Sequence, residues 1–304
     1  MNASIAEGWK QAVEVALSDG ILSKEDESRL RSFHERLVTA RNSETDATLA
    51  RLDKAARDRL SMVARQAALA DIDGEASLQH LARSLDESEL SPGEERRLLA
   101  QSWEKAVNDA LQDGVLSLEE ETALASYLNH FNLSSKDVNS SEGHTRMVKA
   151  VVIREAAEGL VPQRLKVKGS VPFNLMKSEQ LVWMIDDVKY LEVVTRRQRR
   201  GASHGVSVRI AKGVYYSPRT FSSQTHEWEE PIHVDTGMLG VTTKHLYFHG
   251  LRKRFRIRYD RIVSFDPYSD GIGVMRDALS AKPQSFLTGD GWFIYNLVTN
   301  LAQR

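Results

Sequence analysis

Apolar residues in the first 160 positions recur every three or four residues, the spacing of one helix face. Near the amino terminus this face is formed by Ile5, Trp9, Ala12, Val13, Ala16 and Leu17. Residues 47–70, rich in Ala, Leu and Arg, predict a long helix, and a short helix is expected after Gly74. A polar, loop-like segment at 132–144 precedes a last helical stretch. The pattern predicts an all-helical domain over residues 1–160.

The pattern changes in the second half to short β-branched and aromatic runs, separated by Gly, Pro and Asp. Runs of four to eight residues at this spacing predict an antiparallel sheet or barrel of about seven strands. Asp270-Gly271 suits a hairpin turn, and Asp290 is placed to cap a final amphipathic helix, residues 291–302. The predicted fold class is α+β and multidomain: helical bundle 1–160, linker 161–178, and an antiparallel β-barrel with a C-terminal helix, 179–304.

The helical half contains an internal duplication. A shift of 94 positions aligns residues 9–37 with 103–131, and 13 of these 29 positions are identical. The shared positions are mainly apolar and helically spaced, Trp9/Trp103 and Val13/Val107 among them. The repeated feature is therefore a packed helix pair.

Each copy contains a stretch similar to a calcium loop, "SDGILSKEDE" at 18–27 and "QDGVLSLEEE" at 112–121. An EF-hand needs oxygen ligands at positions 1, 3, 5 and 12 around a glycine at position 6. With the glycine so placed, position 3 falls on Leu17 in the first copy and on Leu111 in the second. We therefore expect no calcium site.

A helix stop followed by a helix start accounts for the same residues. Gly20 and Gly114 suit the left-handed residue that ends a helix. Ser23 and Ser117 are then N-caps, with Asp26 and Glu120 in capping-box position. A third start is predicted at Ser91, with Pro92 at the first helical position and Glu94 closing the box.

This "aDGxLsxxE" joint resembles that of TerB-like (tellurite-resistance) domains, where it connects helices of an all-α bundle. The match rests on Asp19, Gly20, Leu22, Ser23 and Glu25, and on Asp113, Gly114, Leu116, Ser117 and Glu119. Some members of that family are thought to bind metal through acidic residues, and no such position carries over to this chain.

Residues from about 179 to 302 resemble the bacterial pleckstrin-homology-like domains. Their "GxLxVTxxxLxFxG" hairpin is matched by Gly237, Leu239, Val241, Thr242, Leu246, Phe248 and Gly250, and the following "IxYxxI" by Ile257, Tyr259 and Ile262. The resemblance implies a binding module without catalytic activity. The upstream segment 196–216 departs from a minimal barrel and is expected to form an insertion or extended hairpin.

Charge divides the chain in the same place. Residues 1–165 hold 20 Lys or Arg and 29 Asp or Glu, whereas residues 166–304 hold 21 and 13. The basic half is thus the one expected to meet an anionic partner, unless the two halves simply attract each other.

Composition excludes several classes. The chain has no cysteine, so disulfides and thiolate ligands are excluded. No secretory signal, spanning helix, P-loop, "GxSxG" or "HExxH" motif is found. We expect a non-enzymatic protein without cofactor or metal, located in the cytoplasm with peripheral membrane attachment left open. Partner and oligomeric state are not readable from the residues.

Strand alternation identifies the first candidate site. In "RKRFRIRY" it sends Phe255 and Ile257 to the core and places Arg254, Arg256 and Arg258 on the outer face. On the partner strand the expected outer residues are His245, Tyr247 and His249. Such a face could receive phosphate groups; the alternative is an ordinary solvated surface.

A basic hairpin is the second candidate, "TRRQRRGASHG", with Arg196, Arg197, Arg199, Arg200, Arg209 and Lys212. The resemblance implies a headgroup-binding loop, since lipid-binding members of the family hold phosphates there; the alternative is that it docks on the acidic half. A metal site from His233, Asp235, His245 and His249 is the weakest candidate.

The predicted function is a binding or scaffold protein that engages a protein partner or an anionic membrane surface. A nucleic-acid binder using the same face is the alternative, and an unrecognised enzyme is third. Single-strand binders display exposed aromatic residues among basic ones. Only Tyr247, Tyr215 and Tyr216 are candidates here, which favours the scaffold.

We expect limited proteolysis of the native protein to cut first within residues 160–178 or 132–144, because these polar segments separate periodic ones. Mass spectrometry of the fragments identifies the sites. Protection of both segments together with cleavage inside the β half would contradict the predicted domain boundary.

Overall fold

The computed structural model describes residues 2–18, 22–37, 43–70, 74–88, 90–165, 167, 171–205, 208–211, 214–216, 219–278 and 281–303, with side chains left out at 2, 3 and 195–229. The fold is α+β, with helices first and an antiparallel sheet after them. The chain divides into two compact units, Met1–Arg154 and Glu155–Arg304.

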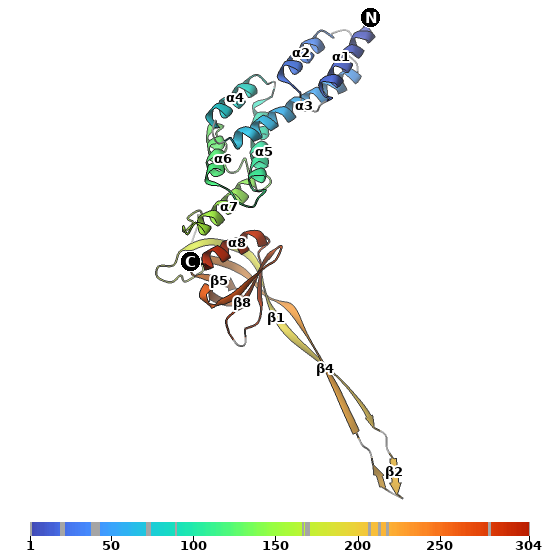
Figure 1. The fold of residues 1–304 in the computed structure, drawn as a ribbon, viewed down its shortest axis with the longest axis vertical. Helices are drawn as coiled ribbons and strands as arrows, with labels where there is room; N and C mark the ends of the chain where they lie inside the picture. Colours follow the sequence, from blue (N-terminus) through green and yellow to red (C-terminus); the bar gives the residue numbers. More distant parts are fainter. Residues whose placement is uncertain are drawn as a thin grey trace. The chain divides into compact units, whose positions relative to one another are not determined.

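The first unit is built from seven described helices around two hydrophobic cores. They are α1 (Asn2–Ala16), α2 (Lys24–Glu35), α3 (Ser43–Ala68), α4 (Gly74–Asp86), α5 (Pro92–Ala110), α6 (Leu118–His130) and α7 (Gly143–Ala157). The long helix α3 contributes side chains to both cores, and Figure 1 shows it running from α1 and α2 toward α4 and α5. Leu52 and Ala56 pack with α1 and α2, whereas Ala64 and Ala68, nearer the end of α3, pack with α4, α5 and α6. The predicted long helix is thus confirmed, four residues earlier at its start.

The two copies of the duplication share one buried hydrogen bond. Trp9 Nε1 donates to the carbonyl of Leu30 at 2.9 Å, and Trp103 Nε1 donates to the carbonyl of Leu124, also at 2.9 Å. Both indoles are fully buried, and a buried indole N–H needs such a partner. Since both pairs are separated by 21 residues, the predicted duplication is confirmed as a repeated helix pair.

The helix joints have the predicted caps. Ser23 accepts a hydrogen bond from the Asp26 amide at 3.0 Å, and Ser117 from the Glu120 amide at 3.1 Å. Ser91 begins α5 with Pro92 in the first turn and Glu94 closing its capping box. Gly114 has a φ of 81°, the left-handed conformation expected after α5. The Asp19-Gly20 turn of the first copy lies outside the described residues.

With Gly114 at position 6, the carboxylates at positions 1, 5 and 12 of the second calcium-like stretch are Asp109, Asp113 and Glu120, and all three bind protein groups. Asp113 accepts from the Val115 amide at 3.0 Å and Glu120 from the Ser117 amide at 2.9 Å. Asp109 forms an ion pair with Arg65 of α3. Leu111, at ligand position 3, packs against the core, so this stretch is a helix joint.

The 132–142 loop before α7 is fixed to the helices despite its polar sequence. Val138 is fully buried, and Asp137 accepts two hydrogen bonds from Arg96, at 3.0 and 2.8 Å. These contacts make early protease cleavage within residues 132–142 unexpected.

The second unit contains a seven-stranded antiparallel sheet in the order β6-β5-β4-β1-β9-β8-β7. Its strands are β1 (Leu181–Gly205), β4 (Arg219–Thr242), β5 (His245–Gly250), β6 (Arg254–Arg258), β7 (Ile262–Pro267), β8 (Gly271–Arg276) and β9 (Gln284–Leu287). The expected strand number is confirmed, and the β7–β8 turn lies at the predicted Asp270-Gly271.

The expected closed barrel is wrong for the described residues, because the sheet is open. No ladder joins its edge strands β6 and β7 within that part of the chain. Between them the chain passes through a short 3-10 turn, η1 (Tyr259–Arg261). The Tyr259 hydroxyl donates to the Thr242 carbonyl at 2.8 Å, which anchors this turn to the end of β4. We attribute the opening to this anchored turn.

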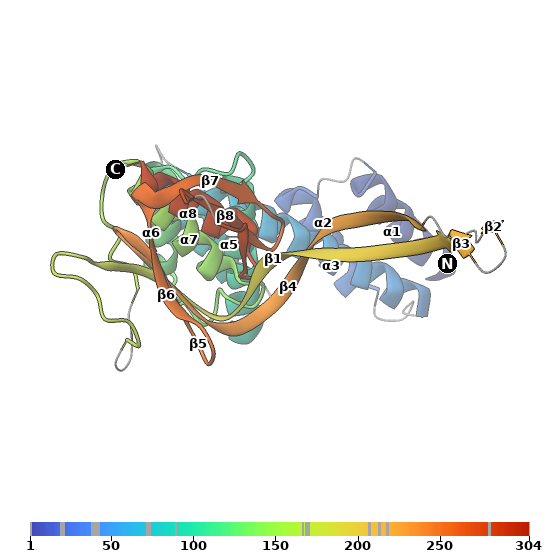
Figure 2. The same cartoon turned by 90° about the horizontal axis from the view of Figure 1, so that it is seen from below.

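Strands β1 and β4 continue beyond the sheet as a two-stranded arm (Figure 1). Their pairing runs from Leu181 opposite Thr242 to Gly205 opposite Arg219, and a small second sheet, β2 (Val208–Ala211) and β3 (Val214–Tyr216), follows the arm. Figure 2 shows the two long strands side by side along this arm. The predicted extended hairpin is confirmed.

The C-terminal helix α8 (Gly291–Ala302) has the predicted residues and cap, with Asp290 accepting from the Phe293 amide at 3.0 Å. It packs on β7 and β8, and Phe293 meets Trp183 of β1 edge-on at 5.0 Å between ring centres. The interior also holds an aromatic cluster: Tyr190, Phe248, Phe255 and Phe286.

Two glycine-to-alanine substitutions in the first unit test the helix joint. Gly114→Ala should lower the free energy of unfolding by about 1–2 kcal/mol, because a Cβ is strained in the left-handed conformation. Gly93→Ala is the control. A Cβ there meets no atom within 4 Å, and alanine is the better helix former by up to about 1 kcal/mol. Urea unfolding measures both; equal effects would contradict the joint.

Candidate anion-binding site

The arginine face of β6 has the predicted alternation. Arg254, Arg256 and Arg258 are exposed, Phe255 is half-buried and Ile257 is buried. The register pairs His249 with Arg254, Tyr247 with Arg256 and His245 with Arg258. Because paired residues share a face of an antiparallel sheet, these six side chains lie on one face of the β5–β6 hairpin.

His245 and Tyr247 are nevertheless buried, so the expectation that they face solvent is wrong. Residues 171–180, mostly assigned to the linker from the sequence, cover this part of the sheet. The Phe173 ring lies 5.5 Å from the Tyr247 ring, and a Cβ at Gly240 would stand 2.5 Å from it. Glycine at position 240 therefore makes room for the covering segment. His249, outside this cover, stays half-buried.

A buried carboxylate, Glu179, organises the covered region. It accepts hydrogen bonds from the Tyr247 hydroxyl and from the Met176 amide, at 2.8 and 2.9 Å. His245 Nδ1 lies 2.8 Å from the same carboxylate, and the Thr242 hydroxyl also bonds to it. The Glu179 side chain is fully buried.

Two opposed effects act on the pKa of Glu179. Burial raises it, but the hydrogen bonds from Thr242, Met176, Tyr247 and His245 outweigh burial and hold the pKa below its usual range. The group is therefore a carboxylate at neutral pH. Burial, and after it the hydrogen bond to the Glu179 carboxylate, raises the pKa of Tyr247, so its hydroxyl remains a donor.

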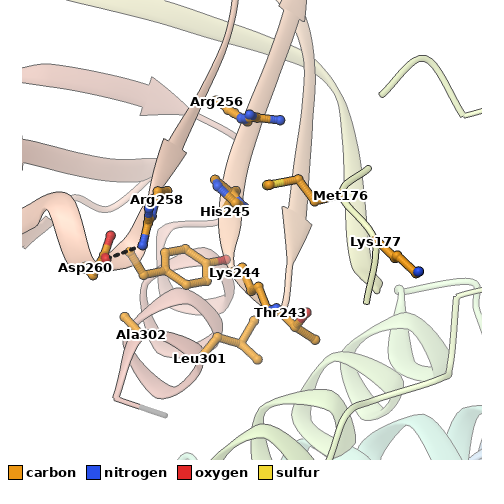
Figure 3. A pocket seen from close by; sticks show the side chains of 11 residues that line it. Met176, Lys177, Thr243, Lys244, His245, Arg256, Arg258, Asp260, Leu301 and Ala302 are labelled. Carbon is orange, nitrogen blue, oxygen red and sulfur yellow. Dashed lines mark hydrogen bonds and ion pairs between the residues drawn. The ribbon is translucent and has the colours of Figure 1, made fainter. Parts of the chain in front are cut away.

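A pocket of about 480 Å3 opens beside this cluster, at the end of the hairpin nearest η1. Met176, Lys177, Thr243, Lys244, His245, Arg256, Arg258, Tyr259, Asp260, Leu301 and Ala302 line it (Figure 3). Four of these side chains are permanently cationic, and one is a carboxylate. Asp260 pairs with Arg258 at 2.6 Å, and Lys244 Nζ lies 3.2 Å from Ser178 Oγ. The net charge of the wall favours an anion of small size.

The other predicted basic residues lie elsewhere. Arg254 is at the far end of β6, with Nε 3.3 Å from the Gly250 carbonyl. Arg196 is in the arm, where it pairs with Trp228 of β4. Along β4, Trp228 is roughly 45 Å from Thr242, the end of the strand nearest the pocket. Arg197, Arg199, Arg200 and Arg209 are also strand residues whose side chains lie outside the described part, as does all of Lys212. The structure therefore does not bring the described strands of this hairpin to the pocket.

The turn between β5 and β6 carries an exposed apolar residue among basic ones. Leu251 is 91% exposed, and Arg252, Lys253 and Arg254 follow it, all exposed. Asp235 fixes this turn by accepting from the amides of Arg252 and Lys253, each at 2.7 Å. The turn is thus held in place while its leucine side chain stays in solvent.

The weakest candidate was a metal site formed by His233, Asp235, His245 and His249, and among the described residues these side chains do not form a set of metal ligands. Asp235 is occupied by the backbone amides, and His233 Nε2 lies 2.9 Å from Thr236 Oγ1. In the part of the chain that the structure describes, no three His, Asp or Glu residues are grouped as metal ligands.

The sequence pattern missed Glu179, Lys177, Lys244 and Asp260. The apolar residues of "PFNLMKSEQ" were a signal that residues 172–180 pack on something. Nothing in a short segment before a strand indicates which strand it covers, however, and so the buried carboxylate could not be placed.

No family model matches the chain, and no curated protein matches it in sequence. None of the helices within the described ranges combines the length and apolar character needed to cross a bilayer.

Replacing Glu179 by Gln should lower the free energy of unfolding by about 2–3 kcal/mol at neutral pH, because an amide cannot accept all four hydrogen bonds. The wild type should lose this contribution as the pH falls below the ordinary glutamate pKa of about 4.3 toward the lower folded value. Thermal unfolding at several pH values measures the difference, with exposed Asp266→Asn as control. If the melting temperatures of E179Q and wild type changed with pH in parallel over the whole range, an ionised Glu179 would be contradicted.

Proposed function

We propose that the second unit is a non-catalytic binding module that attaches the protein to an anionic membrane surface. The observation that carries the proposal is the run of exposed cations along one hairpin. Arg254, Arg256 and Arg258 lead from the Leu251 turn to the lysines of the pocket. A face of this kind matches a plane of phosphate groups, and the leucine can enter the interfacial region.

The fold agrees with this proposal. Seven antiparallel strands followed by one packed helix are the plan implied by the pleckstrin-homology-like resemblance, although the sheet is open. Under this proposal the TerB-like helical unit, with its acidic composition, is the part left free to bind other proteins as a scaffold. A fold alone does not determine function; the exposed arginines of the hairpin are the feature that supports membrane binding.

Nucleic acid is the less favoured anion. Binding of single strands relies on exposed aromatic side chains that stack on bases. Tyr247, the candidate on this face, is buried under Phe173 and bonded to Glu179. Tyr215 and Tyr216 are in β3, and their side chains lie outside the described residues.

Changing Arg254, Arg256 and Arg258 together to Gln in the full-length protein should weaken its binding to anionic vesicles by one to two orders of magnitude, on the basis of about 1 kcal/mol per cation near the surface. Co-sedimentation with phosphatidylglycerol vesicles measures this. Binding by the wild type should also fall at high salt, because screening acts within about 10 Å. The binding that remains at high salt should depend on the apolar side chain of Leu251, because salt does not screen it, and Leu251→Ser should therefore weaken that remaining binding.

The control is a variant that loses the same charge from other exposed positions of the second unit, Lys189, Arg276 and Lys282, each changed to Gln. It should bind nearly as well as wild type. Heparin and single-stranded DNA serve as competing polyanions. Equal losses in both triple variants would show a diffuse charge effect, and no binding to any polyanion at low salt would overturn the proposal.

A further inference from the structure

An unsatisfied nitrogen lies in the wall of the basic pocket. His245 is 3% exposed, and its Nε2 is buried with no hydrogen-bond partner among the described residues. Buried polar nitrogens are nearly always paired, so this one calls for an explanation. His245 lines the pocket together with Arg256, Arg258 and Lys244 (Figure 3).

The bond at the other ring nitrogen determines what Nε2 can do. Nδ1 faces the Glu179 carboxylate at 2.8 Å, and this carboxylate, being ionised, has no proton to give. Nδ1 must therefore carry the proton. In the neutral ring Nε2 then presents a lone pair, which repels an anion. Only the doubly protonated ring can donate from Nε2 to an anionic oxygen.

We propose that this pocket binds a doubly charged phosphate group, and that His245 takes up one proton from solvent when the group binds. This inference rests on the proposed function and names the ligand chemistry of its pocket. The proton adds to Nε2, which then donates to a phosphate oxygen, while Nδ1–H continues to donate to Glu179. No covalent bond to the ligand forms or breaks.

The groups around His245 support a protonated ring once an anion is present. Glu179 faces it from the covering segment, Tyr247 from its own strand, Arg256 and Arg258 from β6, Tyr259 and Asp260 from η1, and Lys244 and Lys177 from the pocket rim. The four cations attract the dianion, and the bound dianion together with Glu179 stabilises the imidazolium.

Access to Nε2 requires a movement that the covering segment permits. Met176 lines the same pocket, is 47% exposed, and is held through its backbone amide to Glu179 rather than through its side chain. An unbranched thioether side chain changes rotamer easily. Its displacement would open the histidine to a ligand without disturbing the carboxylate cluster.

The test uses inorganic sulfate, which stays a dianion over the pH range studied. Uptake of one proton on binding changes Kd by at most tenfold per pH unit. Calorimetric titration of the full-length protein should therefore show sulfate binding at least about tenfold tighter at about pH 6 than at about pH 8, within the limit that two pH units allow. Titrations in buffers of different ionisation enthalpy should give an uptake approaching one proton.

His245→Asn keeps a donor toward Glu179 and removes Nε2. It should bind sulfate weakly and without pH dependence. His249→Asn, on the same strand and face but away from the pocket, should behave as wild type. Thermal unfolding of both variants checks that they are folded. Met176→Ala, which shortens the cover, should bind sulfate at least as well as wild type and keep the proton uptake.

The outcomes separate this inference from the proposed function. Vesicle binding with pH-independent sulfate binding, or an unchanged pH slope in H245N, would overturn the proton coupling and leave the membrane proposal standing. Loss of binding to both vesicles and sulfate would overturn both. Vesicles containing phosphatidic acid, compared at equal surface charge with phosphatidylglycerol, distinguish a lipid phosphomonoester from a free anion as the source: tighter binding with the same pH slope indicates the lipid.

Discussion

Burial of the Glu179 carboxylate is the constraint on which the binding end of the second unit depends. A charge removed from water must be matched by hydrogen bonds from several directions. Here the donors come from the covering segment, the end of β4 and alternate residues of β5. Meeting at one carboxylate, they fix the segment on the sheet, the position of the first β5 residues and the inner wall of the pocket. The exposed arginines of β6 are positioned in turn by their pairing with β5.

The parts of the fold set by local rules were predictable from the sequence. Helix periodicity, the serine caps and Asp290 depend on residues only a few positions apart, and the structure has them as expected. The alternation of β6 follows the same logic, and its arginines are exposed. Closure of the sheet depends instead on how β6 and β7 approach across η1, a long-range matter that the pattern does not encode.

The candidate site was half predictable for the same reason. Strand alternation correctly put Arg256, Tyr247 and His245 on one face, but it could not show that a distant segment covers part of that face. Phe173 reaches Gly240, 67 positions later in the chain, and Glu179 reaches Tyr247, 68 positions later. Contacts between residues so far apart in the chain depend on the tertiary structure and are not encoded in a local pattern. They turn two presumed surface residues into the interior of the site.

Helix α3 couples the stability of the two copies of the duplication. It has one helical backbone but lends its earlier residues to one core and its later residues to the other. If either copy of the repeat unfolds, part of α3 therefore loses the helices against which it packs. As in solenoid proteins, stability becomes a property of neighbouring repeats and the element between them. A cut through the middle of α3 would not release two small domains; it would leave each with half of the helix on which it was assembled.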